Sequence, residues 1–98
     1  MAEERLIRRV VVEGFVQGVG YRDFARRAAL RLGVSGWVRN RMDGTVEALL
    51  FGPPATVEAM LAEMRRGPRG AEVSGLKLAE TSELEEAKPS GFVIRQTG

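Results

Sequence analysis

The sequence contains neither cysteine nor histidine. Without cysteine there can be no disulfide, thiolate nucleophile or cysteine-ligated zinc, and without histidine no imidazole acid–base catalysis, Ser-His-Asp triad or histidine-bound metal. Only two aspartates occur, Asp23 and Asp43, so a carboxylate metal cage would have to rest mainly on glutamate. The groups that remain are better suited to binding and polarising an anion than to moving protons.

Long apolar runs are also missing. None approaches the roughly 20 residues that a membrane-spanning helix needs, and residues 1–5 lack the hydrophobic centre of a signal peptide. We therefore expect a cytoplasmic protein without membrane contact. The chain has 98 residues, 44% of them apolar and 29% charged, as is typical of one folded domain, so residues 1–98 are expected to form a single domain.

Positive charge is concentrated in the first part of the chain. Residues 1–41 carry nine Lys or Arg against four acids, whereas residues 42–98 carry six against nine, and the whole chain has a net charge of +2. Thirteen of the 15 basic residues are arginine, whose forked donors recognise phosphate and carboxylate. A GC-biased genome or a heat-adapted surface also produces a high arginine total, so the positions of individual arginines are more informative.

Hydrophobic periodicity and turn residues predict five strands and two helices. The first strand has apolar residues on both alternating sets, which indicates burial on both sides. Helical spacing begins at Tyr21 and stops at Gly33, a natural C-cap, and Asp43-Gly44 predicts a hairpin. In order, the predicted elements are a strand over 6–16, a helix over 21–32, strands over 35–40 and 45–51, a helix between 52–54 and 67–70, a strand within 71–79 and a strand over 92–95, with a polar loop over 80–90.

This order is β-α-β-β-α-β, with the segment 71–79 supplying either the last strand or an extra ribbon. Two interleaved right-handed β-α-β units predict an α+β, ferredoxin-like sandwich, in which a mostly antiparallel sheet carries both helices on one face. Trp37 is expected in the core or on the open sheet face, and Glu13 and Glu47 are expected to pair with arginines in a structural role. The fold hosts enzymes, RNA binders, metal chaperones and ligand sensors, so it does not decide the function.

The glycine-rich segment 17–22, with the sequence Gln-Gly-Val-Gly-Tyr-Arg, joins the first strand to the first helix. Unpaired N–H groups and the helix dipole favour an anion there, and glycines with positive φ let successive amides turn inward. The segment is not a dinucleotide fingerprint, because Asp23 stands where a third glycine is needed, and it is not a Walker loop, because no Lys-Ser/Thr follows. The alternative is a tight turn that merely requires glycine.

Arg22 and Asn40 are the two candidate working side chains. A cation in the first turn of a helix opposes the dipole by about 0.3–1 kcal/mol, and a bound phosphate would reverse that effect; the alternative is a solvated Arg22 partly neutralised by Asp23. Asn40 could hold and aim a water, or it could serve only the turn that follows it. We expect the second strand to end at the edge where the first begins, so the approach of Asn40 to the glycine segment depends on register.

This chain resembles the acylphosphatase family in two long signatures. The first is Gly14-Phe15-Val16-Gln17-Gly18-Val19-Gly20-Tyr21-Arg22, and the second is Gly36-Trp37-Val38-Arg39-Asn40 followed by Asp43-Gly44 and Val46-Glu47. Gly52-Pro53 and Phe92-Val93-Ile94-Arg95 agree as well, so the resemblance spans nearly the whole chain. Two positions depart from some members of the family: Arg41 stands where a hydroxyl residue often follows the asparagine, and Gly98 stands where an aromatic residue ends the chain.

The resemblance implies a ferredoxin-like fold and hydrolysis of the carboxyl–phosphate bond of acyl phosphates, without a metal or a cofactor. It implies that Arg22 grips the phosphate and that Asn40 orients the attacking water. It also implies that the phosphate is bound by backbone amides at Gln17, Gly18, Val19, Gly20 and Tyr21.

The residue inventory fits such a reaction, because the leaving carboxylate has a pKa near 4–5 and needs no general acid. The expected partner is a small-molecule acyl phosphate, and we expect a monomer. One rival is a nucleic-acid binder on the same fold, against which stands the lack of an RNP1-like aromatic pattern in any predicted strand. The other rival is an anion-sensing module that binds phosphate without turnover.

Overall fold

A computed structural model describes residues 5–79 and 90–98 of the chain. All the predicted strands and helices are present, with ends within two residues of those expected, while the predicted loop over 80–90 lies, apart from Ser90, outside the described residues. In order, the elements are β1 (Leu6–Phe15), α1 (Tyr21–Leu32), β2 (Ser35–Asn40), β3 (Val46–Gly52), α2 (Pro54–Arg66), β4 (Glu72–Ala79) and β5 (Phe92–Ile94).

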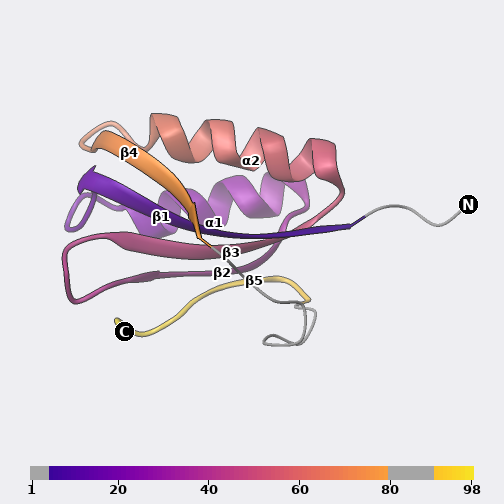
Figure 1. Cartoon of the computed structure of the whole chain (residues 1–98), viewed down its shortest axis with the longest axis horizontal. Helices are drawn as coiled ribbons and strands as arrows, with labels where there is room; N and C mark the ends of the chain where they lie inside the picture. The colour runs from indigo at the N-terminus through magenta and orange to yellow at the C-terminus, as the bar shows by residue number, and fades with distance from the viewer. Residues whose placement is uncertain (1–4, 80–89) are drawn as a thin grey trace, which may run out of the picture.

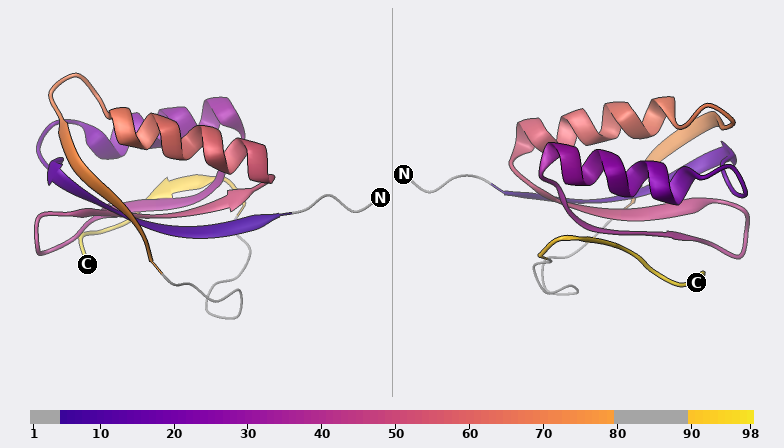
Figure 2. Two further views of the ribbon diagram at one scale, coloured as in Figure 1. Left: turned by 45° about the horizontal axis from the view of Figure 1, so that its top comes forward. Right: turned by 180° about the vertical axis from the view of Figure 1, so that it is seen from behind.

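The five strands form one sheet in the order β4-β1-β3-β2-β5. The pairs among β1 to β4 are antiparallel and only β5 is parallel to its neighbour, β2. Both helices cover the same face of this sheet (Figures 1 and 2). The predicted ferredoxin-like sandwich is therefore confirmed. The segment 71–79 supplies its fourth strand, and the short β5 extends the opposite edge.

The relative direction of β1 and β2 corrects one sequence-based expectation. Both strands pair antiparallel with β3, so they run in the same direction, and Val12 and Asn40 both lie opposite Val46. The expectation that β2 ends where β1 begins is wrong. Helix α1 returns the chain to the end of the sheet where β1 begins, and β2 then runs in the same direction as β1. The loop after β1 and the turn after β2 consequently lie at the same end of the sheet (Figure 1).

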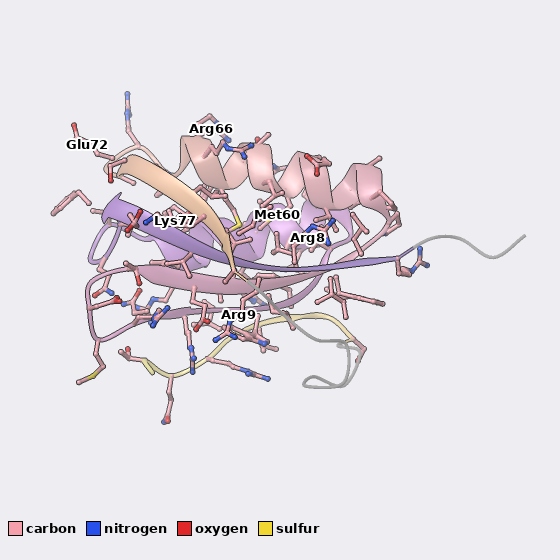
Figure 3. All side chains as sticks on the ribbon, in the orientation of Figure 1. Arg8, Arg9, Met60, Arg66, Glu72 and Lys77 are labelled. Atoms are coloured by element: carbon pink, nitrogen blue, oxygen red, sulfur yellow. The ribbon has the colours of Figure 1, made fainter. Side chains whose placement is uncertain are left out.

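The main core lies between the helices and the sheet. Met60 points from α2 toward the strands in Figure 3 and is fully buried. A smaller cluster of Ile7, Trp37 and Leu49 lies on the opposite face, which explains why β1 carries apolar residues on both alternating sets. The buried residues of the main core include Val10, Val12, Ala25, Ala28, Ala29, Val46, Ala48, Leu50, Val57, Met60, Leu61 and Met64.

The two ends of α1 are built differently. At its C-terminus the N–H of Gly33 donates to the carbonyl of Ala29 at 2.8 Å, so the predicted cap is present. At its N-terminus Gly20 occupies the cap position and supplies no side-chain hydrogen bond. The first amides of α1 therefore lack the acceptor that a Ser, Thr, Asp or Asn cap would provide. None of the helices in the described residues has the length and apolar character needed to cross a membrane.

Candidate active site

The loop between β1 and α1 forms one wall of the site. Gly18 and Gly20 have φ angles of 74° and 77°, and a Cβ at either would meet nothing within 4 Å, so backbone conformation rather than space requires glycine here. The helix begins its own hydrogen bonding only at Phe24, whose N–H donates to the carbonyl of Gly20 at 3.0 Å. No backbone N–H of residues 17–23 donates a hydrogen bond within the described part of the chain. These donors are available to a ligand.

Arg22 is the second residue of α1 and is half-buried. Its guanidinium makes no hydrogen bond or ion pair with any residue that the structure describes. Asp23 pairs instead with Arg27, at 2.9 Å one helical turn away. Asp23 is therefore not the ion-pair partner of Arg22, and the positive charge of Arg22 lies beside the positive end of the helix dipole.

Asn40 is the last residue of β2, at the same end of the sheet as the loop between β1 and α1 (Figure 1). Its Oδ1 is buried and accepts no hydrogen bond from the described residues, which is uncommon for a buried amide oxygen. The turn after β2 is closed by other groups: the N–H of Arg41 donates to the carbonyl of Thr45 at 2.9 Å, and the N–H of Thr45 donates to Oδ1 of Asp43 at 3.0 Å. The side chain of Asn40 takes no part in these bonds, so the turn does not explain why an asparagine stands at this position.

A cavity of about 240 Å³ brings these groups together. Arg22 and Asn40, which come from different elements, both line it, and so do Gly18 and Gly20. Its volume is several times the roughly 30 Å³ that one water occupies in the liquid, so a phosphate group can enter. The complete lining is Val16, Gly18, Gly20, Tyr21, Arg22, Asp23, Asn40 and Ile94.

Not all of the other predicted site residues line the cavity. Tyr21 lines the cavity, but its hydroxyl donates to the carbonyl of Met64 at 2.7 Å and burial raises its pKa, so the phenol stays neutral and ties α1 to α2. Gln17 and Val19 belong to the loop but do not line the cavity. The lining includes three residues that sequence reasoning did not select as site residues, Val16, Asp23 and Ile94. Val16 belongs to the first signature, and the only signal for Ile94 of β5 was the agreement of the segment 92–95 with the family.

Comparison with known proteins identifies the family. The family model described as Acylphosphatase matches residues 8–94. The chain belongs to the acylphosphatase family. An acylphosphatase of Rhizobium etli is 51% identical over 86 residues, which cover 88% of this chain and 89% of the relative, and one of Acidiphilium cryptum is 46% identical over 93 residues, which cover 95% and 99%. The crystal structure of the Bacillus subtilis acylphosphatase superposes with a TM-score of 0.85 at 30% identity, covering 94% of this chain and 99% of that one.

These similarities confirm the family that the two signatures indicated. Acylphosphatases are hydrolases that act on acyl phosphates, and this chain has that activity. The acylphosphatase fold explains why the two signatures lie so far apart in the sequence. The first covers the loop after β1 and the second covers β2 with its turn, and the parallel course of β1 and β2 brings both to one cavity.

Proposed function

We propose that this chain hydrolyses acyl phosphates with Arg22 and the loop amides binding the phosphate and Asn40 holding the attacking water. The observation that carries the proposal is the cavity lined by both Arg22 and Asn40. The guanidinium of Arg22 has no partner among the described residues, and the buried Oδ1 of Asn40 accepts no hydrogen bond from them. The cationic Arg22 is suited to bind the phosphate, and the amide of Asn40 is suited to bind the water.

Phosphate binding is supported by the loop and the helix together. The N–H groups of residues 17–22 lie at the N-terminus of α1, where the helix dipole favours a negative charge. Arg22 adds a forked donor suited to two phosphate oxygens. A bound phosphate also removes the unfavourable interaction between Arg22 and the dipole, so the amides and the cation stabilise the same ligand.

Asn40 is suited to orient a water because its amide carries an acceptor and a donor. A water held by this amide in the cavity would lie close to a phosphate in the glycine loop, because Asn40, Gly18 and Gly20 line the same cavity. Holding the nucleophile near its target can supply several kcal/mol of a reaction barrier. The role of Asn40 is to position the water, since an amide cannot act as a base at neutral pH.

The reaction is an in-line displacement at phosphorus. The water oxygen forms a bond to phosphorus while the bond from phosphorus to the carboxyl oxygen breaks, and the electron pair leaves with the carboxylate. A proton of the water passes to a phosphate oxygen. The carboxylate has a pKa near 4–5 and leaves without protonation, which accords with a chain that has no histidine. Phosphate monoesters have a much poorer leaving group and a higher barrier, so their hydrolysis should be negligible.

A monomer as the active form stays a prediction, which the mass of the active protein in solution would test. Nucleic-acid binding is not part of the proposal. Trp37 is not available for base stacking, because it is only 4% exposed and the guanidiniums of Arg39 and Arg95 lie over its ring at 5.2 and 4.6 Å. The cytoplasmic location stays a prediction, which fractionation of cells would test.

The decisive experiment compares the parent with Arg22→Lys and Asn40→Ala in the hydrolysis of benzoyl phosphate with EDTA present. We expect turnover by the parent in EDTA. Asn40→Ala should lower kcat by about 100-fold or more while inorganic phosphate still inhibits, and Arg22→Lys should weaken both turnover and phosphate inhibition. Circular dichroism and the melting temperature check that both variants are folded.

Three results would contradict the proposal. A folded parent that binds phosphate without hydrolysing benzoyl phosphate would support the anion-sensing module instead. Full activity of Asn40→Ala would mean that Asn40 does not hold the attacking water. Loss of turnover in EDTA that an added divalent metal restores would overturn the prediction that the reaction needs no metal.

A further inference from the structure

The side chain of Gln17 connects the glycine loop with the turn that follows β2. Its Nε2 donates to the carbonyl of Arg41 and to that of Thr45, both at 2.8 Å. Arg41 directly follows Asn40, and Thr45 ends the turn before β3. Among the described residues, no other side-chain hydrogen bond joins the loop over 16–20 to the turn over 41–45.

These bonds show what the Gln17 side chain does not do. Both N–H groups of its amide are used by the two carbonyls, and the residue does not line the cavity, so its side chain is not available to the phosphate. The backbone amide of Gln17 remains part of the proposed phosphate loop. The two parts of this residue therefore have separate tasks.

The topology shows why a side-chain connection is useful here. Arg22 and the loop follow β1, Asn40 ends β2, and β3 lies between these two strands, so backbone pairing joins the halves of the site only through a third strand. We propose that Gln17 is a positioning residue, which fixes the distance between the phosphate loop and the water held by Asn40. This inference rests on the proposed function of Arg22 and Asn40.

Loss of the Gln17 amide should leave the fold intact. The carbonyl of Arg41 also accepts from the N–H of Gly44 at 3.2 Å, and the carbonyl of Thr45 accepts from the N–H of Arg41 at 2.9 Å. Each carbonyl thus keeps one partner within the turn when Gln17 is replaced. The substitution orphans no backbone group, and what it removes is the connection between loop and turn.

The inference predicts a specific split in the kinetics. Phosphate binding depends on the conformation of the loop and on Arg22, both of which lie on one side of the connection. Attack by water depends on the distance across it, and a misplacement of about 1 Å can cost about 100-fold in rate. Loss of the connection should therefore lower kcat and leave phosphate affinity nearly unchanged.

The test uses Gln17→Met, which keeps the length of the side chain and removes both donors. We expect kcat for benzoyl phosphate to fall by about 10- to 100-fold, and the inhibition constant of inorganic phosphate to change by less than about threefold. Gln17→Asn, with the amide retained on a shorter side chain, should give the same split. Val57→Ala is the matched control, because it removes buried atoms in α2 away from the cavity and should lower the melting temperature without lowering kcat.

Two outcomes would overturn the inference while the proposed function stands. One is an active parent whose kcat is unchanged in both Gln17 variants. The other is a parallel fall of kcat and phosphate affinity, which would mean that Gln17 shapes the loop itself. A parent without turnover would instead overturn the proposed function, and the inference with it, so the two failures are distinguishable.

Discussion

The neighbouring residues Arg39 and Asn40 of β2 lie on opposite faces of the sheet and differ in whether their side chains have partners. Asn40 lies toward the cavity with a buried oxygen that has no partner among the described residues. Arg39, on the opposite face, binds Glu47 at 2.8 Å and lies over the ring of Trp37. Arg9 binds the second oxygen of Glu47 at 2.6 Å, on the side of the sheet away from the helices (Figure 3).

The difference separates groups that hold the fold from groups that act on a ligand. Glu47 is fully buried, and two arginines compensate the loss of its hydration. Leaving a buried acceptor unsatisfied costs about 1–3 kcal/mol of stability. The unsatisfied Oδ1 of Asn40 therefore destabilises the fold, and no hydrogen bond from the described residues offsets the loss. Among the described residues, the other such atom is the indole Nε1 of Trp37, which belongs to the apolar cluster of Ile7, Trp37 and Leu49. Of these two residues, only Asn40 lines the cavity.

Replacement of Arg22 should have the largest effect. We expect Arg22→Gln to lower kcat/KM for benzoyl phosphate by about 1000-fold, because removal of one preorganised donor already costs about 100- to 1000-fold and this change also removes a charge. Stability should stay the same or rise by up to about 1 kcal/mol, since a cation leaves the first turn of α1. Kinetics and urea unfolding measured on the same preparation test both parts.

Arg26, on the exposed side of the same helix, provides the matched control for Arg22. Arg26→Gln removes an equal charge away from the cavity and should change kcat/KM by less than about twofold. If both variants lost activity to the same degree, the effect would come from the net charge of the protein, and the contrast between the two faces would fail.

Replacement of Glu47 should have the next largest effect, and it should act on stability. We expect Glu47→Gln to lower the free energy of unfolding by about 2 kcal/mol. Removing one partner of a wholly buried pair costs about 3–5 kcal/mol, but the side chains of Arg9 and Arg39 are 36% and 29% exposed and can hydrate. Activity per folded molecule should be retained within about threefold, because backbone pairing still holds β2 against β3.

A second carboxylate of the chain sharpens this comparison. Glu63 on α2 also binds two arginines, Arg31 at 2.9 Å and Arg66 at 2.6 Å, but both arginines are more than 60% exposed. Glu63→Gln should therefore destabilise the protein far less than Glu47→Gln, since surface pairs contribute little. Equal losses would show that burial of Glu47 is not what makes its pairing important.

Local features of the fold could be predicted from the sequence, because single residues determine them. Gly33 caps α1 where expected, and the hairpin forms at Asp43-Gly44, since few residues adopt the backbone angles of such turns. Arg22 and Asn40 could be selected because both belong to long signatures. The structure then places the two side chains on the lining of one cavity.

Relations between distant segments could not be predicted in the same way. The direction of β2 is the exception, because the two strands of the predicted β-α-β unit are parallel, and the expectation that β2 ends where β1 begins did not follow from that unit. The sequence indicated that Glu13 and Glu47 pair with arginines. Glu47 does, whereas the nearest cation to Glu13 is Lys77 at 3.5 Å, because the register of β1 with β4 determines its neighbour. The contacts of Gln17 depend on the same long-range placement.

The smallest predicted effect is a difference in acid sensitivity between the parent and Glu47→Gln. Burial by itself raises the pKa of Glu47, but hydrogen bonds and positive charge from Arg9 and Arg39 outweigh it and hold the pKa below the ordinary value of 4.5. A carboxyl whose pKa is lowered on folding stabilises the protein above its unfolded pKa, and this contribution is lost as the pH falls through the folded pKa.

The stability gap between the parent and Glu47→Gln should therefore be full at pH 7 and shrink below about pH 4.5. Asp43 and Glu63 also have lowered pKa values, through hydrogen bonds from Thr45 and from Arg66 respectively. They are present in both proteins, so their acid sensitivity cancels in the difference. Urea unfolding of both proteins between pH 7 and pH 3 measures the gap. A gap that stayed constant or widened in acid would mean that Glu47 stabilises the open face through its shape and not through its charge.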